Sequence, residues 1–285
     1  MKWCDGKLYS GGKDGNVCIT DTSSMSVVKS IHFGTLIRAV DCANGVIAVG
    51  TRDGNIWKCQ EESEEKTCVM QSHSDGEVWG LGIVGNIVVT TADDNQIKAW
   101  DITQRTCVGT GKISDQVRHV KRGASSLSKK AASQCARGCD IAPGSGHVAI
   151  GCNDGTLSIR AAATDLDNEI ATNRDSKQWI EAVQYCPAGS KLAVGSHDNK
   201  IRIYNAEDGY SLHGTCDAHQ SFITSVDWSL DAAMLRTVCG AHELLFFNTS
   251  DCSQAKSGAS STKGTDWATN STKYSWSTEG IIPSG

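Results

Sequence analysis

Proline is scarce in this chain, and long apolar runs and phosphate-binding loops are missing from it. The 285 residues include three prolines, carry a formal net charge of −5 and contain no apolar run approaching 18 residues, the length of a membrane-spanning helix. No Gly-x-x-x-x-Gly-Lys loop is present, so nothing in the sequence supports phosphate cradling. The acidic balance argues against a body that binds polyanions. We therefore expect no cofactor, and neither nucleic acid nor membrane as a partner.

What the chain does contain is one short phrase that occurs six times: a small-residue pair, a tight turn with Asp, then alternating apolar residues. The successive turns are separated by 39, 41, 60, 44 and 43 residues, and Ala241 replaces Asp in the degraded sixth copy. A period near forty, with a two-residue turn between apolar strands, is typical of a four-stranded propeller blade. The five turn aspartates are Asp14, Asp53, Asp94, Asp154 and Asp198.

The repeats predict an all-β, WD40-type β-propeller with diverged repeats, in which about five to six of seven blades are present. Because the chain opens shortly before the first turn and closes midway through a seventh unit, we expect residues 1–285 to form an incomplete propeller from a longer protein. The units are predicted at roughly 1–32, 33–70, 71–110, 135–175, 178–215 and 218–258, with a partial unit at 264–285.

The turn aspartates are expected to be structural, because an Asp-Gly or Asp-Asn pair accommodates a positive φ and the carboxylate can accept backbone N–H groups. In WD-type blades this Asp joins a buried network with a His, a Ser or Thr, and a Trp. The third unit has His73, Asp94 and Trp100, but Ala92 stands where we expect the hydroxyl residue; the sixth keeps His219. We therefore expect blades held more by packing than by polar networks.

The thirteen cysteines do not suggest a disulfide framework. Their number is odd, no Cys-x-x-Cys pair occurs, and the closest pair is Cys135 and Cys139. Several, such as Cys18, Cys152 and Cys239, stand at strand positions where other repeats carry small or apolar residues. We interpret them as buried, reduced thiols of a cytosolic protein, in preference to disulfides or metal ligands.

No catalytic or metal-binding constellation emerges from the sequence. The eight histidines are scattered, and no pair has metal-ligand spacing with a third ligand. His73 and His219 precede predicted inner strands, where a blade-locking role is favoured over catalysis. Trp79 and Trp228 lie on predicted inner strands and are interpreted as core residues, although an inner-strand aromatic can also line a propeller's binding face.

Some phrases are more specific than a generic WD repeat. Residues 72–81 (Ser-His-Ser-Asp-Gly-Glu-Val-Trp-Gly-Leu) resemble the His-Thr-Asp-Glu-Leu-Trp-Gly-Leu segment of the echinoderm microtubule-associated protein-like family. Residues 192–199 and 221–229 also resemble that family, and 35–40 and 266–269 follow in its order and at nearly its spacing. The similarity covers essentially the whole chain. It is closest to the second of the family's two fused propellers.

This resemblance implies a non-catalytic protein that binds tubulin or microtubules, and other cytoskeletal or axonemal proteins, through propeller surfaces. It places the protein in the cytoplasm and cytoskeleton, with stable microtubules such as those of a cilium or flagellum as one setting. The alternative hypothesis is a general WD-repeat scaffold or substrate receptor in a complex unrelated to tubulin. An enzyme domain that uses the central channel is a third hypothesis, and no motif supports it.

One interval between turn aspartates is longer than the repeat period, and its extra residues carry a net positive charge. The interval between Asp94 and Asp154 is about twenty residues longer than a blade needs, and it contains a basic insertion at roughly 117–134. A cationic loop on an acidic body suits electrostatic docking to an acidic lattice such as tubulin, whereas the alternative is a solvated insertion without a function. The candidate partner-binding residues are Arg118, Lys121, Arg122, Lys129 and Lys130.

The opposite charge is concentrated at residues 61–65, which read Glu-Glu-Ser-Glu-Glu. This run lies between the second and third predicted units. A run this short is typical of a solvated outer loop, and its charge also discourages edge-to-edge pairing of sheets.

Overall fold

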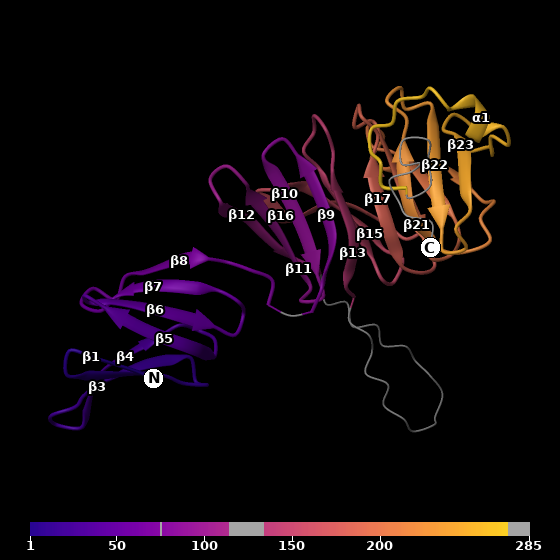
Figure 1. The fold of residues 1–285 in the computed structure, drawn as a ribbon. Coiled ribbons are helices and arrows are strands. Elements are labelled where there is room, and N and C mark those ends of the chain that lie inside the picture. The colour runs from indigo at the N-terminus through magenta and orange to yellow at the C-terminus, as the bar shows by residue number, and fades with distance from the viewer. Residues whose placement is uncertain (75, 114–133, 273–285) are drawn as a thin grey trace, which may run out of the picture. The chain divides into compact units, whose positions relative to one another are not determined.

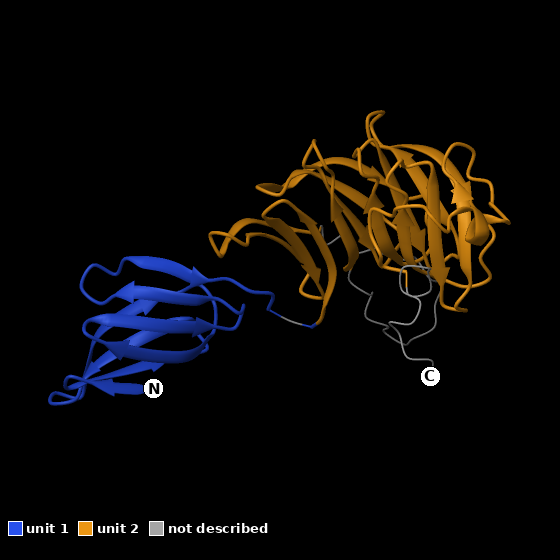
Figure 2. Ribbon diagram, turned by 45° about the horizontal axis from the view of Figure 1, so that its top comes forward, with its two compact units in different colours: residues 1–76 blue, residues 77–285 orange. Residues whose placement is uncertain are grey.

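The computed structural model describes residues 1–74, 76–113 and 134–272, most of which lie in antiparallel sheets (Figure 1). The chain divides into two compact units, residues 1–76 and 77–285 (Figure 2). Among the described residues there are six sheets and one short helix, α1 (Gly258–Ser261). That helix, four residues long, is too short to cross a lipid bilayer, and no other helix is described.

The first unit contains two four-stranded sheets, each with its strands paired in chain order. Its own core includes Val17, Ile19, Ile47 and Val49, none of which is exposed. The strands of the first sheet are β1 (Lys2–Cys4), β2 (Lys7–Gly11), β3 (Asn16–Asp21) and β4 (Ser26–His32). Those of the second sheet are β5 (Ile37–Ala43), β6 (Val46–Thr51), β7 (Ile56–Gln60) and β8 (Lys66–Met70).

The second unit contains three four-stranded sheets and one three-stranded sheet, again paired in chain order. The third sheet consists of β9 (Val78–Val84), β10 (Ile87–Ala92), β11 (Gln96–Asp101) and β12 (Thr106–Lys112). The fourth consists of β13 (Ala136–Ile141), β14 (Val148–Cys152), β15 (Leu157–Ala162) and β16 (Asp165–Asn173). The fifth consists of β17 (Ile180–Tyr185), β18 (Lys191–Ser196), β19 (Ile201–Asn205) and β20 (Ser211–Cys216). The last consists of β21 (Ile223–Trp228), β22 (Met234–Cys239) and β23 (Leu244–Asn248).

These sheets confirm the prediction of an all-β chain built from propeller blades. Within the second unit the first strands β9, β13, β17 and β21 pack against one another in succession. The second strands are the most deeply buried: every residue of β14 is buried, and so are five of the six residues of β18. Strands buried on both faces read as continuous apolar runs, which explains why the repeats alternate only in part.

The six turns between second and third strands share one backbone conformation. The residue after the Asp position adopts the left-handed region in every copy: Gly15 (81°), Gly54 (77°), Asn95 (60°), Gly155 (85°), Asn199 (67°) and His242 (63°). Glycine and asparagine adopt this region at low cost, so these residues are suited to the turn. Asp14, Asp94 and Asp154 each accept the N–H two residues further on, at 3.2, 3.0 and 3.0 Å. His242 shows that the degraded sixth copy keeps the same turn.

Neighbouring sheets approach closely where a glycine near the end of a second strand faces the first strand of the next sheet. A Cβ at Gly151 would lie 2.2 Å from Cγ2 of Ile180, and one at Gly195 would lie 2.5 Å from Cγ2 of Ile223. Both isoleucines are fully buried. At Gly151 and Gly195 the small residue before the turn therefore makes room for the adjacent sheet.

The hydroxyl groups inside the blades lie elsewhere than predicted. The indole of Trp100 donates to the hydroxyl of Thr90 at 2.8 Å, so the prediction that Ala92 marks a lost hydroxyl partner is wrong. In the last sheet Nε2 of His219 lies 2.7 Å from Oγ1 of Thr237, the residue that corresponds to Thr90. The hydroxyl residue thus stands four residues before the Asp position of the turn, and not two residues before it as predicted. The repeated sequence motif does not reveal this, because it depends on strand register.

The acidic run at residues 61–65 is not uniformly solvated as predicted. Glu62 to Glu65 are exposed, but the carboxylate of Glu61 lies 2.5 Å from Nζ of Lys7 and accepts the hydroxyl of Tyr9 at 2.6 Å. Its side chain is 16% exposed, because the second sheet packs against the first and brings Glu61 to Lys7 and Tyr9 of β2. All thirteen cysteines are free thiols, and seven of them are buried.

A buried carboxylate ties the end of the described chain to the last sheet. Asp227 on β21 is fully buried and accepts Nε of Arg236 at 3.0 Å. It also accepts the N–H and hydroxyl groups of Ser271 and Thr272, at 2.8–3.0 Å, and the hydroxyl of Thr269. Burial opposes ionisation, but these hydrogen bonds prevail and lower the pKa of Asp227 below its ordinary value of 3.8.

We expect Gly151→Ala to destabilise the second unit by about 1–3 kcal/mol, because the new methyl group overlaps Ile180 in a packed core. Urea unfolding monitored by circular dichroism measures the loss. Gly264→Ala is the matched control, since a Cβ there meets nothing within 4 Å. Equal stability of the two variants would contradict the proposed close approach.

Asp227→Asn should cost about 3–5 kcal/mol of folding free energy at neutral pH, because Arg236 then keeps a buried charge without its partner. Since the folded-state pKa is lowered, the carboxylate's stabilisation is present above pH 3.8 and is lost as pH falls below it. Denaturation curves at neutral and acid pH test both points, with exposed Glu207→Gln as the control. An Asp227→Asn variant with the parent's stability and acid sensitivity would refute this account.

Candidate binding surface

The first strand of five sheets carries a β-bulge near its beginning, at the same place in each. The strand register shifts by one residue there, and the extra residues are Arg38, Trp79, Arg137, Glu181 and Thr224. A bulge residue has no opposite partner in the ladder, and the local bend re-aims its side chain. The blades thus carry a different side chain at one repeated surface position.

A second repeated contact lies beside each bulge. The residue that follows the second strand donates its N–H to the residue that precedes the first strand. This bond joins Arg52 to Leu36 (2.8 Å), Asp93 to Glu77 (3.1 Å), Asn153 to Cys135 (2.9 Å), His197 to Trp179 (2.7 Å) and Gly240 to Phe222 (2.8 Å). Each of these five sheets therefore brings three variable residues together, namely the bulge residue and the two residues that this hydrogen bond joins.

In the second unit, side chains at these positions form one continuous row. The guanidinium carbon of Arg137 lies 4.5 Å from the ring centre of Trp79 and 5.0 Å from that of Trp179. The ring of Trp179 lies 5.3 Å from that of His197, which lies 4.7 Å from that of Phe222. We call these five residues the aromatic strip. They come from four consecutive sheets.

Charge pairs hold the strip in place. Asp93 accepts Nη1 of Arg137 at 2.6 Å and Nε1 of Trp79 at 3.0 Å. The backbone N–H of Glu77 also donates to Asp93, and this bond, followed by those to Trp79 and Arg137, lowers the pKa of that carboxyl. Asp93 therefore orients Trp79 and Arg137, and Nε2 of His197 is held separately, 2.6 Å from the carboxylate of Glu181.

The exposure of the strip indicates what it can do. The side chain of Arg137 is only 11% exposed, whereas Trp79, Trp179 and Phe222 are 43%, 40% and 40% exposed. Exposed aromatic faces beside a largely desolvated arginine are the side chains enriched at the centres of protein interfaces. Because the strip is pre-ordered, a partner would pay little side-chain entropy on binding. The strip is therefore the candidate binding surface.

The two inner-strand tryptophans chosen from the sequence have different environments. Trp228 is fully buried, and its indole donates to the carbonyl oxygen of Gln184 at 3.0 Å, so its assignment to the core is confirmed. The core assignment of Trp79 is wrong, because the bulge turns its side chain to the surface, as the alternative interpretation allowed. Sequence reasoning missed Arg137, Trp179 and Phe222. Aligning the repeats on their turns would have placed Trp179 and Phe222 at one repeated position, before the first strand, and Arg137 at another, the bulge.

Most of the other residues chosen from the sequence lie in the turns and segments between strands or outside the described part. The turn aspartates stand between second and third strands, and Asp198 also receives Nη1 and Nη2 of Arg202 at 3.1 and 2.8 Å. His73 lies between β8 and β9, and His219 between β20 and β21. The five basic candidates of the insertion, Arg118, Lys121, Arg122, Lys129 and Lys130, lie outside the described residues.

Repeated four-stranded blades of this kind, with variable residues at one end of each first strand, define a WD-repeat β-propeller. The sequence profile of a family described as the echinoderm microtubule-associated protein second beta-propeller matches residues 78–285, more than half of the chain. The chain belongs to this family of WD-repeat microtubule-associated proteins.

Two curated relatives agree with this membership. The chain is 46% identical to the ciliary WD repeat-containing protein ctxp80 of Euplotoides octocarinatus, covering 100% of this chain and 40% of that protein. It is 30% identical to the 77 kDa echinoderm microtubule-associated protein of Strongylocentrotus purpuratus, covering 99% of this chain and 39% of the relative. The chain thus spans about two fifths of the length of these relatives.

Solved structures support the fold alone. A chain of the mitotic checkpoint complex matches with a TM-score of 0.51 and 19% identity, over 87% of this chain and 75% of that one. The computationally designed Ika8 protein matches with a TM-score of 0.50 and 17% identity, over 89% and 71% of the two chains.

Arg137→Gln should destabilise the second unit by about 1–3 kcal/mol, because it removes two cation–π contacts and the ion pair with Asp93. Trp79 and Trp179 should then become more exposed, and their fluorescence should shift to longer wavelength. Lys177→Gln, at an exposed lysine near the same end of β17, is the control and should change neither quantity. An unchanged emission spectrum in Arg137→Gln would show that the strip is not held by this cation.

Proposed function

We propose that this chain is the tubulin-binding part of a non-catalytic microtubule-associated protein that acts in the cytoplasm and cytoskeleton. The observation that carries the proposal is the aromatic strip, an ordered and exposed surface across four consecutive blades of a chain that belongs to a microtubule-associated family. The name of the ciliary relative motivates a setting on stable ciliary or flagellar microtubules, among other axonemal proteins. Nucleic acid and membrane are not among the proposed partners.

The basic insertion supplies a second, electrostatic part of the proposed contact. Its last residues are joined to Gln134, which stands three residues before Arg137 of the aromatic strip. Chain connectivity thus favours one contact in which the strip gives packing and the five cations attract an acidic lattice. Solvent-exposed pairs contribute about 0.2–1 kcal/mol each, so five of them would change affinity by roughly tenfold or more.

Microtubule co-sedimentation tests the proposal with the complete chain. Replacing Arg118, Lys121, Arg122, Lys129 and Lys130 with Ser should weaken binding about tenfold at low salt. The difference should shrink as ionic strength rises past about 0.15 M, where the Debye length is about 8 Å. Replacing Trp179 and Phe222 with Ala should weaken binding at every salt concentration, because that contribution is apolar.

A variant with five exposed cations changed to Ser elsewhere, at Lys13, Lys58, Arg105, Lys177 and Lys256, controls for net charge. It should bind more tightly than the insertion variant. Parent protein that stays in the supernatant at low salt would overturn the tubulin proposal and favour a WD-repeat scaffold with another partner. Equal affinity of parent and insertion variant at all salt concentrations would show that the insertion contributes nothing to microtubule binding. The proposed contact would then consist of the aromatic strip alone.

A further inference from the structure

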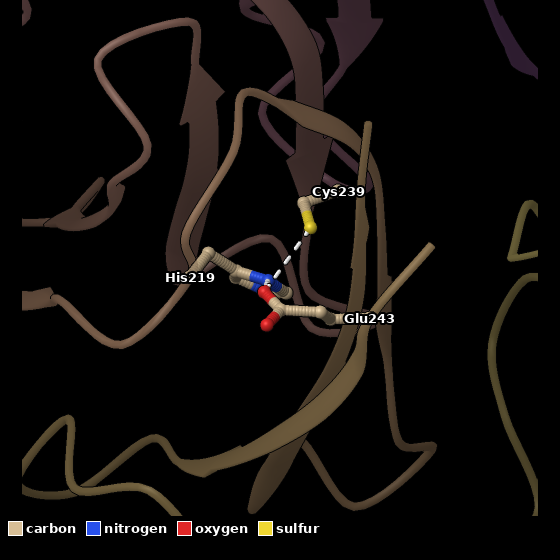
Figure 3. A group of neighbouring side chains, drawn as sticks. All are labelled: His219, Cys239 and Glu243. Atoms are coloured by element: carbon tan, nitrogen blue, oxygen red, sulfur yellow. Dashed lines mark hydrogen bonds and ion pairs between the residues drawn. The ribbon is translucent and has the colours of Figure 1, made fainter. Parts of the chain in front are cut away.

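Three side chains with metal-ligand atoms converge at one turn of the last sheet (Figure 3). Cys239 ends β22 and Glu243 immediately precedes β23, so the two residues flank the tight turn between these strands. The N–H of Cys239 donates to the carbonyl oxygen of Glu243 at 3.3 Å, which closes the turn. His219 reaches the same point from the segment before β21. One ligand atom from each residue lies within 4.8 Å of the other two.

The distances fit the coordination sphere of a small divalent cation. An oxygen of Glu243, Oε2, lies 3.3 Å from Sγ of Cys239 and 3.5 Å from Nδ1 of His219. In a tetrahedral zinc site with Zn–S of about 2.3 Å and Zn–N and Zn–O of about 2.0–2.1 Å, neighbouring ligand atoms are about 3.3–3.6 Å apart. Two of the three ligand pairs thus already have the separation that this geometry requires, and the third pair lies within 4.8 Å.

The imidazole of His219 directs Nδ1 to this point, where Oε2 of Glu243 lies 3.5 Å away. The His219 side chain is fully buried, and Nδ1 has no hydrogen-bond partner. The other nitrogen, Nε2, lies 2.7 Å from the hydroxyl of Thr237, which can itself donate to the carbonyl oxygen of Leu245 at 3.5 Å. In the tautomer with the proton on Nε2, this nitrogen donates to Thr237, and the lone pair of Nδ1 faces the cluster. Outer partners of this kind fix the tautomer of histidines that bind metals.

The carboxylate is also held from outside. The N–H of Gln220 donates to Oε2 of Glu243 at 3.1 Å, which keeps the side chain against the turn. The Glu243 side chain is 35% exposed, whereas Cys239 and His219 are buried. An ion can therefore enter from the Glu243 side, and a water molecule can occupy the remaining position of a tetrahedron.

The cluster is not a by-product of the repeat. In the fifth sheet, the turn aspartate Asp198 accepts the N–H of Lys177. The equivalent of Lys177 in the last sheet is Gln220. Because the turn there has Ala241 in place of Asp, the N–H of Gln220 is accepted by Glu243 instead. The equivalents of Cys239 and Glu243 in the other five turns never combine a thiol with a carboxylate. They are Gly12 and Asn16, Thr51 and Asn55, Ala92 and Gln96, Cys152 and Thr156, and Ser196 and Lys200.

We propose that His219, Cys239 and Glu243 bind one Zn²⁺ ion. A thiolate, an imidazole and a carboxylate are zinc ligands, and the sulfur disfavours Mg²⁺ and Ca²⁺. On binding, the Cys239 thiol releases its proton to solvent, and the thiolate and carboxylate together balance the charge of the ion. The metal joins the segment before β21 to the β22–β23 turn, so it stabilises the last blade.

Titration of the complete, reduced chain with Co²⁺ tests this site. The parent should bind one equivalent with a near-ultraviolet thiolate-to-cobalt charge-transfer band, which Zn²⁺ should then displace. Cys239→Ser should abolish this band, and Glu243→Gln should weaken Co²⁺ affinity at least tenfold. Cys152→Ser is the matched control, because Cys152 occupies the equivalent position in the fourth sheet and faces Thr156 across its turn.

Zn²⁺ should also raise the midpoint of thermal unfolding of the parent and of Cys152→Ser, but not that of Cys239→Ser. The midpoints of thermal unfolding of the variants are also compared without metal. This comparison shows whether a variant has lost metal binding or has lost folding stability. A charge-transfer band of parent intensity in Cys239→Ser would assign the metal to other thiols and refute the site. Absence of any band in the parent at a Co²⁺ concentration of 0.1 mM would refute it as well. Glu243 would then serve only as the hydrogen-bond acceptor that replaces the missing turn aspartate. Neither result depends on microtubule binding.

Discussion

Close approach between neighbouring sheets is the constraint on which the rest of the structure depends. At Gly151 and Gly195 the space that a side chain would fill is taken by Ile180 and Ile223 of the next first strand. This contact fixes where each first strand begins, and so where its bulge falls. Because the packing repeats, the bulge residues and their neighbours recur at the same end of each blade, and side chains from several blades meet there.

The backbone at that end repeats from sheet to sheet, whereas the side chains do not. The bulge and the N–H bond beside it recur in five sheets. The bulge side chains differ, from Arg38 in the first unit to Trp79, Arg137 and Glu181 in the second. The same backbone geometry in successive blades can thus present a different set of side chains at the surface of each blade. In the second unit this surface combines exposed indoles with an arginine held between them, which is why the strip is the candidate binding surface.

The last sheet shows how a degraded repeat can acquire another role. Loss of Asp at position 241 removes the usual hydrogen-bond acceptor, and Glu243 substitutes for it from a position nearer the third strand. That shift brings a carboxylate to the thiol of Cys239 and the buried imidazole of His219. The left-handed conformation of His242 persists, so the turn changed its chemistry without changing its backbone.

The sequence alone determined the all-β class, the number of blades, the turn positions and the family, because a period near forty with Asp-Gly and Asp-Asn turns is a local pattern. It did not reveal that Trp79 is exposed, that Thr90 is the hydroxyl partner of Trp100, or that Glu61 is paired. The first two facts depend on strand register, since a one-residue shift at a bulge reverses which face a side chain occupies. The pairing of Glu61 depends on packing between two sheets of the first unit. The aromatic strip and the cluster at Cys239 join residues from separate strands and blades. Only tertiary structure brings such residues together, since their spacing along the chain follows no fixed rule.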